Sequence, residues 1–121
     1  MTLKSLFGPL ALLVSLVAAA PVFAAEPAAK PVLIKPNKNH ERCFVLDAGQ
    51  KLEYRFSSAN KLNFNLHYQK GGDQTYYPVK LDKTTGESGL FEAKARDKYC
   101  LYWENRTDAD IELTYSYRDG K

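Results

Sequence analysis

Hydrophobic and polar residues alternate one by one through much of the chain. In residues 51–57, Leu52, Tyr54 and Phe56 share one side while charged residues take the other, and residues 61–69 repeat the pattern more strongly. A period of two with aromatic and aliphatic residues is typical of a strand that has one buried face. The pattern predicts half-buried strands and no helix of useful length.

Further short strands, separated by turn residues, are expected at residues 42–46, 75–80, 90–95, 99–104 and 111–118. Residues 32–34 add one short edge strand, and Pro78 places its own strand at an edge or a bulge because proline cannot donate to a ladder. We interpret residues 58–60 as a break and residues 82–89 as a polar loop. So many short strands predict an all-β fold, an antiparallel β-sandwich of about 7–8 short strands.

Residues 1–24 have the layout of a secretory signal peptide. An apolar run follows a basic residue, and Val22 and Ala24 are small enough to direct cleavage after Ala24. Gly8 and Pro9 interrupt the run, which is shorter than the roughly 20 residues that span a bilayer. The residue directly after the cleavage site is Ala25 and not the cysteine of a bacterial lipid anchor, so we expect a periplasmic or secreted protein with no stable membrane anchor.

The remaining chain divides into two parts. Residues 25–40 are rich in proline and lysine and are expected to form a flexible leader, and residues 41–118 form a single domain. The whole chain of 121 residues has a formal net charge of +3, with both signs mixed along it. Such a charge predicts no strong field for nucleic acid or anionic lipid.

Cys43 and Cys100 are the two cysteines of the chain. In a small secreted domain such a pair favours a disulfide over two free buried thiols, and a bridge helps a domain whose core is modest. A redox pair would more often show Cys-x-x-Cys spacing. A metal site would need more ligands nearby. His40 precedes Cys43 by three residues, but the sequence has no second closely spaced pair of ligand residues near Cys100. We therefore expect a disulfide, no metal and no cofactor.

His67 is the best single candidate for chemistry. It shares the polar face of its strand with Asn65 and Gln69. A general base needs a positioned partner, and the sequence places no acid beside His67. We interpret it as a hydrogen-bonded strand residue and expect no catalytic site.

Eight tyrosines and one tryptophan exceed what a compact core of this size needs. Tyr76, Tyr77, Tyr102 and Tyr117 cannot all be central. Tyrosine is favoured at protein interfaces because it supplies rigid contact area with a polar tip, and it also stacks on sugars. With His67, these four tyrosines form the candidate binding surface. Asn105 begins a glycosylation-type triplet, which we interpret as a turn before the last strand.

The order of these strands and cysteines resembles a GOLD domain, the lumenal β-sandwich of cargo receptors in the early secretory pathway. The matching segments are Cys43-Phe44 and residues 49–56, 62–66, 89–93 and 99–105. In the last segment the cysteine directly follows Tyr99, which departs from the family's spacing.

The resemblance implies a bridged cysteine pair and a role in protein recognition or self-association rather than catalysis. The family's coiled coil, membrane span and sorting tail have no counterpart after residue 118, so receptor function is not expected. The sequence thus predicts a non-enzymatic protein-interaction module whose partner is another envelope protein or a second copy. The alternatives are a module that binds a small ligand or carbohydrate and, third, a hydrolase.

Overall fold

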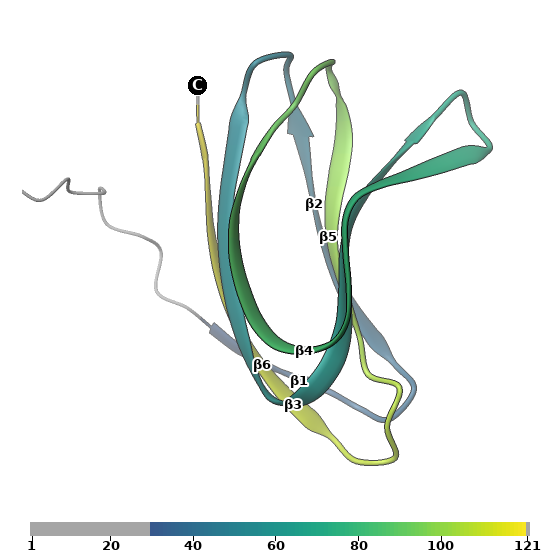
Figure 1. Cartoon of the computed structure of the whole chain (residues 1–121), viewed down its shortest axis with the longest axis vertical. Helices are drawn as coiled ribbons and strands as arrows, with labels where there is room; N and C mark the ends of the chain where they lie inside the picture. The colour runs from purple at the N-terminus through teal and green to yellow at the C-terminus, as the bar shows by residue number, and fades with distance from the viewer. Residues whose placement is uncertain (1–29, 121) are drawn as a thin grey trace, which may run out of the picture.

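The computed structural model describes residues 30–120, which form one curled antiparallel sheet of six strands (Figure 1). The strands are β1 (Lys30–Ile34), β2 (Asn39–Leu46), β3 (Lys51–Lys70), β4 (Gln74–Glu92), β5 (Asp97–Glu104) and β6 (Ile111–Gly120). Within residues 30–120 there is no helix that would cross a membrane. The predicted signal peptide, residues 1–24, lies outside the described part of the chain.

The long β3–β4 hairpin bends, so the sheet folds over into two facing halves (Figure 1). The first part of β3 pairs with β6, with Tyr54 opposite Tyr117, and the second part pairs with β5, with Phe64 opposite Trp103. β4 follows β3 through both parts. β1 extends β6 and β2 extends β5. We call these layers the β6 half and the β5 half.

The predicted all-β, antiparallel fold is confirmed, but its strands divide differently from the prediction. Residues 58–60, expected to be a break, lie within β3. The register with β4 shifts between Ser57 and Leu62, where β3 leaves its partner β6 and joins β5. The small polar residues therefore accommodate a bend rather than a reversal of the chain.

Residues 82–89, expected to be a loop, lie within β4. Gly89 faces Tyr54 in the register, and a Cβ on Gly89 would lie only 2.5 Å from the Tyr54 hydroxyl. The tyrosine ring thus covers the glycine. Pairing with β3 gives the backbone N–H and C=O groups of this segment hydrogen-bond partners that water would supply in a loop. Pro78 lies as predicted, because β4 has β3 as its one neighbouring strand and the register shifts between Leu66 and Tyr68.

The core consists of the side chains that alternation assigned to the inner face. The largest fully buried ones are Phe64, Trp103, Leu46, Leu52, Leu66, Leu101, Ile111 and Leu113. The Trp103 ring contacts Phe64 in its own half at 5.5 Å and Tyr115 of the other half at 4.6 Å between ring centroids. The contact with Tyr115 joins the two halves.

The segment predicted as a leader is structured from Lys30 onward, which corrects its boundary at residue 40. β1 contains the expected edge strand at residues 32–34 and pairs with the start of β6, with Ile34 opposite Ile111. Ile34 is buried and adds to the core. An apolar triplet between prolines was therefore enough to extend the sheet by one strand.

Asn105 lies in the turn between β5 and β6 and is fully buried. Its Nδ2 donates to the carbonyls of Ile34, at 2.9 Å, and Ala109, at 2.7 Å. Its Oδ1 accepts from the Thr107 backbone N–H at 2.8 Å. The predicted turn is confirmed, and the same side chain also ties β1 to it. An amide with both hydrogens engaged inside the protein is not accessible to glycosylation in the folded state.

His40 faces the space between the two halves. Its Nε2 lies 3.0 Å from the Tyr115 hydroxyl, and its ring stacks on Trp103 at 5.8 Å between centroids. Burial lowers the pKa of His40 below its ordinary value of 6.5, and the positive charge of Arg42 lowers the pKa further.

This shift predicts a pH dependence of stability. Because the folded state binds the His40 proton more weakly than the unfolded state, its contribution is fully present above pH 6.5 and is lost as the pH falls through the lowered pKa. We expect the urea midpoint of the wild type to fall more between pH 7 and pH 5 than that of His40→Gln, whose amide keeps a polar group near Tyr115. Parallel pH profiles for the two proteins would contradict this assignment.

Candidate functional site

The disulfide lies on the outer face of the β5 half. Cys43 on β2 pairs with Cys100 on β5, and Cys100 pairs in turn with His67 on β3, so the three residues form one row across three strands. Cys43 and Cys100 are bridged, which confirms the predicted disulfide. The residues next to these three in sequence include Phe44, Leu101 and Leu66, whose side chains are buried in the core. Because successive side chains of a strand point to opposite faces, Cys43, Cys100 and His67 point outward.

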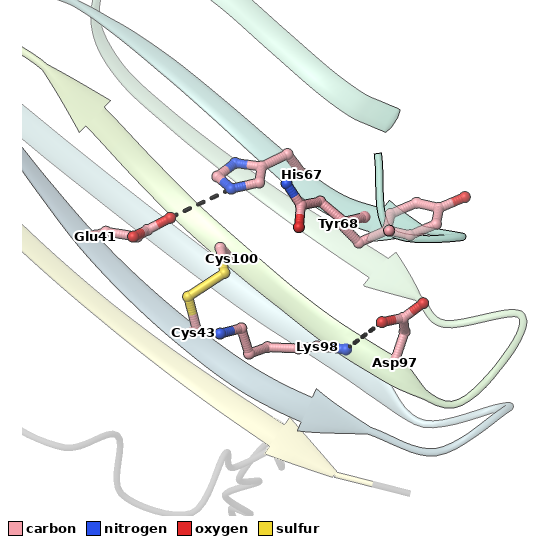
Figure 2. A pocket seen from close by; sticks show the side chains of 9 residues that line it. Glu41, Cys43, His67, Tyr68, Asp97, Lys98 and Cys100 are labelled. Atoms are coloured by element: carbon pink, nitrogen blue, oxygen red, sulfur yellow. Dashed lines mark hydrogen bonds and ion pairs between the residues drawn. A yellow bond between two sulfur atoms is a disulfide. The ribbon is translucent and has the colours of Figure 1, made fainter. Parts of the chain in front are cut away.

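His67 is held at both ring nitrogens. Its Nδ1 lies 2.7 Å from Oδ1 of Asn65, and its Nε2 lies 3.2 Å from Oε2 of Glu41, which approaches from β2 across the disulfide (Figure 2). These two contacts fix the orientation of the imidazole ring between an amide oxygen and a carboxylate. The His67 side chain is 19% exposed, so the pair is shielded but reachable.

Glu41 was missed by the sequence analysis, which placed no acid beside His67. The contact depends on the register of β2 against β5 and of β5 against β3, which alternation along one strand does not reveal. A usable signal was present, since Glu41 precedes Cys43 by two residues and shares its strand face. Once the bridge to Cys100 is assumed, Glu41 is expected on the same outer face as Cys100 and as His67, which pairs with Cys100.

Two tyrosines flank His67 on this face. Tyr77 lies 6.0 Å and Tyr102 5.9 Å from the imidazole between ring centroids, and the ammonium of Lys80 lies over the Tyr77 ring. Burial raises the pKa of Tyr102, and the carboxylates of Glu104 and Glu41 raise it further. The Tyr102 phenol therefore stays neutral at physiological pH and keeps its hydroxyl proton to donate.

A pocket of about 400 Å³ opens beside these residues. Glu41, His67 and the disulfide line one end, and Asp97 and Lys98 line the other (Figure 2). The lining residues include Gln69 and Tyr68 but no serine, threonine or free thiol. The arrangement supplies charged and hydrogen-bonding groups, the imidazole of His67 among them, and those lining residues include no hydroxyl of serine or threonine and no free thiol.

The other two residues of the candidate surface lie elsewhere. Tyr76 stacks on Tyr68 at 5.4 Å further along the β3–β4 hairpin, whose end projects from the body of the sheet (Figure 1). Tyr117 lies on β6, where its hydroxyl accepts a hydrogen bond from Arg42 and its ring meets Phe44 at 4.7 Å. The structure thus gathers His67, Tyr77 and Tyr102, leaves Tyr76 beside them, and places Tyr117 apart.

A second cavity of about 230 Å³ lies near the base of the projecting hairpin and was not expected from the sequence. Its lining is mainly apolar and includes Tyr68, Phe91, Tyr99 and Pro78. It forms where the Tyr99 ring meets Tyr68 at 5.0 Å and Phe91 at 5.1 Å.

No family model matches this chain, and no curated protein matches it in sequence. Among solved structures, it is similar to PliG, a periplasmic inhibitor of g-type lysozyme from Aeromonas hydrophila, with a TM-score of 0.53 and 19% identity over 81% of this chain and 93% of that one. It is also similar to the pre-peptidase C-terminal domain of a Bacillus anthracis collagenase, with a TM-score of 0.55 and 14% identity over 75% of this chain and 90% of that one.

A third similar structure is the carbohydrate-binding module TmCBM61 in complex with β-1,4-galactotriose. Its TM-score is 0.53 and its identity 13%, over 77% of this chain and 70% of that one. At such low identities these likenesses establish the sandwich-type fold alone. The resemblance to GOLD domains therefore stays a prediction from the sequence.

Proposed function

We propose that this protein is a non-enzymatic protein-interaction module of the GOLD-like type that works in the periplasm or outside the cell. It binds its partner, another envelope protein or a second copy, through the outer face of the β5 half. The observation that carries the proposal is the cluster of Tyr77 and Tyr102 beside His67, which itself lines a pocket on this outer face.

The physical properties of this face suit protein recognition. Tyr77 is 51% exposed, the adjacent Tyr76 of β4 is 39% exposed, and Val45, on the same face as Cys43, is 57% exposed. Large side chains fixed on paired strands lose little conformational entropy on binding, and tyrosines also offer a polar tip to the partner. The projecting end of the β3–β4 hairpin can insert into a groove of the partner, and the adjacent pocket can accept a side chain of the partner.

The disulfide supports the proposed compartment, and the surroundings of His67 support a role in binding. A disulfide persists in an oxidising compartment, which fits the predicted signal peptide. His67 is engaged by Asn65 and Glu41, and the pocket that it lines offers no serine, threonine or free thiol to activate. We therefore assign the His67–Glu41 pair to recognition rather than to hydrolysis.

A pull-down from periplasmic extract tests the proposal. The wild type should retain a specific protein, and Tyr77→Ala combined with Tyr102→Ala should weaken its capture by roughly 30-fold, as expected when interface hot spots worth about 2 kcal/mol are lost. The matched control is Leu33→Ala combined with Leu90→Ala. Those two leucines are 54% and 67% exposed and lie in the β6 half. Equal capture by both double variants would refute the assigned face.

A carbohydrate-binding function is the second candidate. It is favoured by the size and polarity of the 400 Å³ pocket, where Glu41, Gln69 and Asp97 can accept or donate hydrogen bonds to hydroxyl groups beside Tyr68. A glycan array separates the two functions. A strong glycan signal that Gln69→Ala abolishes, together with no retained protein, would replace the leading proposal with this one.

A further inference from the structure

We propose that reduction of the Cys43–Cys100 disulfide creates a tetrahedral zinc site. Its ligands are the thiolates of Cys43 and Cys100, Nε2 of His67 and a carboxylate oxygen of Glu41. All four side chains lie on the outer face of the β5 half and come from three adjacent strands. Two thiolates, an imidazole and a carboxylate are ligands that Zn²⁺ takes in tetrahedral sites.

Three of the four proposed ligands already lie close together. The donor atoms of Glu41, His67 and Cys100 lie within 4.8 Å of one another. Metal–ligand bonds of about 2.0–2.2 Å at the tetrahedral angle place a nitrogen and an oxygen ligand about 3.4 Å apart. Nε2 of His67 and Oε2 of Glu41 lie 3.2 Å apart. One edge of the tetrahedron is therefore nearly formed.

The two sulfur ligands need only side-chain rotation. At zinc–sulfur distances of about 2.3 Å, two thiolates lie about 3.8 Å apart, a separation that cysteine side chains on paired strands reach by changing χ1. The ladder from Asn39 to Leu46 against β5 keeps both cysteines in register, with their Cα atoms 4.0 Å apart.

The surroundings of His67 prepare it as a ligand. A hydrogen bond from Nδ1–H to Oδ1 of Asn65, at 2.7 Å, leaves the lone pair of Nε2 free for a metal. Metal-binding histidines are commonly oriented by such a second hydrogen bond. With the disulfide intact the sulfurs carry no negative charge, and His67 and Glu41 alone form an incomplete site. Metal binding at this place therefore depends on the redox state.

The reduction requires a dithiol reductant of the thioredoxin-like class. Its thiolate attacks one sulfur of the bridge, its second thiol resolves the mixed disulfide, and the reductant leaves as a disulfide. The protein gains two electrons and two protons as two thiols, and Zn²⁺ then displaces those protons to water. Both cysteines line the 400 Å³ pocket, and Cys43 is the more accessible point of attack because it is part-exposed, whereas Cys100 is 4% exposed.

Cobalt titration tests the proposal. In the protein reduced with a phosphine that does not compete for metal, Co²⁺ should bind at one equivalent and give the thiolate charge-transfer band and visible bands of tetrahedral cobalt. Zn²⁺ should displace it, and the oxidised protein should give neither band. His67→Ala should weaken cobalt binding by about 100-fold or more, and Glu41→Gln should weaken it less. His40→Gln, which changes the other histidine, should bind as the wild type does.

If reduction partly unfolds the protein, circular dichroism still tests the proposal, because it measures whether zinc restores or stabilises the folded state. Zinc should raise the melting temperature of the reduced protein, or restore its β-sheet spectrum, and should leave the oxidised protein unchanged. Equal cobalt affinity in reduced wild type and His67→Ala would show binding by the thiols alone and overturn the proposal. Failure of zinc to restore an unfolded reduced chain would overturn it as well. Neither outcome bears on partner binding, which the oxidised protein tests separately.

Discussion

We expect Asn105→Ala to lower the free energy of unfolding by about 3 kcal/mol. The side chain is fully buried and makes hydrogen bonds to Ile34, Thr107 and Ala109. Alanine would remove the amide donor to the Ile34 carbonyl, leave the Ala109 carbonyl with the Thr107 hydroxyl, and remove the acceptor that shapes the turn. Since the bonds converge on one amide, their loss affects the end of β1 and the start of β6 together.

Urea unfolding followed by tryptophan fluorescence measures this effect, because Trp103 lies in the core that unfolding exposes. Asn39→Ala is the control: Asn39 is an exposed asparagine on β2 and should change stability by less than about 0.5 kcal/mol. A loss below about 1 kcal/mol for Asn105→Ala would mean that the turn forms without its side chain.

The second large effect concerns the disulfide. We expect Cys43→Ala combined with Cys100→Ala to cost about 4 kcal/mol, because a bridge across a sequence separation of 57 residues restricts the unfolded chain strongly. β2 should respond most, since it lies at the sheet edge with β5 as its one paired neighbour.

Denaturation midpoints of the oxidised wild type and the double variant measure the cost, and hydrogen exchange should show that amides of β2 lose the most protection. A reductant should destabilise the wild type and leave the cysteine-free variant unchanged. Equal stability of the oxidised wild type and the variant would contradict the role given to the bridge.

The sequence predicted those parts of the fold that depend on neighbours along the chain. Alternation placed Leu52, Phe64 and Trp103 inside, and the cysteine count predicted the bridge. It did not predict that β3 and β4 run continuously through both halves. Glycine and serine normally end strands, but Gly89 is covered by Tyr54 on the paired strand, and such a contact is set by register rather than by local composition.

The same limit applies to the candidate site. His67, Tyr77 and Tyr102 were chosen by residue type, and the structure brings them together. Tyr117 was chosen by the same criterion and lies on the other half, beside Arg42. Glu41 was missed because its approach to His67 spans three strands. Residue type thus identified candidates, but only the pairing of β2 with β5 and of β5 with β3 shows which of them lie together.

Site-specific photocrosslinking in living cells tests most directly whether the outer face of the β5 half binds a partner. A photoreactive amino acid would replace Tyr77 or Tyr102 on this face and, as controls, Leu33 or Leu90 on the β6 half. We expect a discrete protein adduct from positions 77 and 102, weakened by His67→Ala, and none from positions 33 and 90. Adducts of equal yield from all four positions, or from the control positions alone, would contradict it.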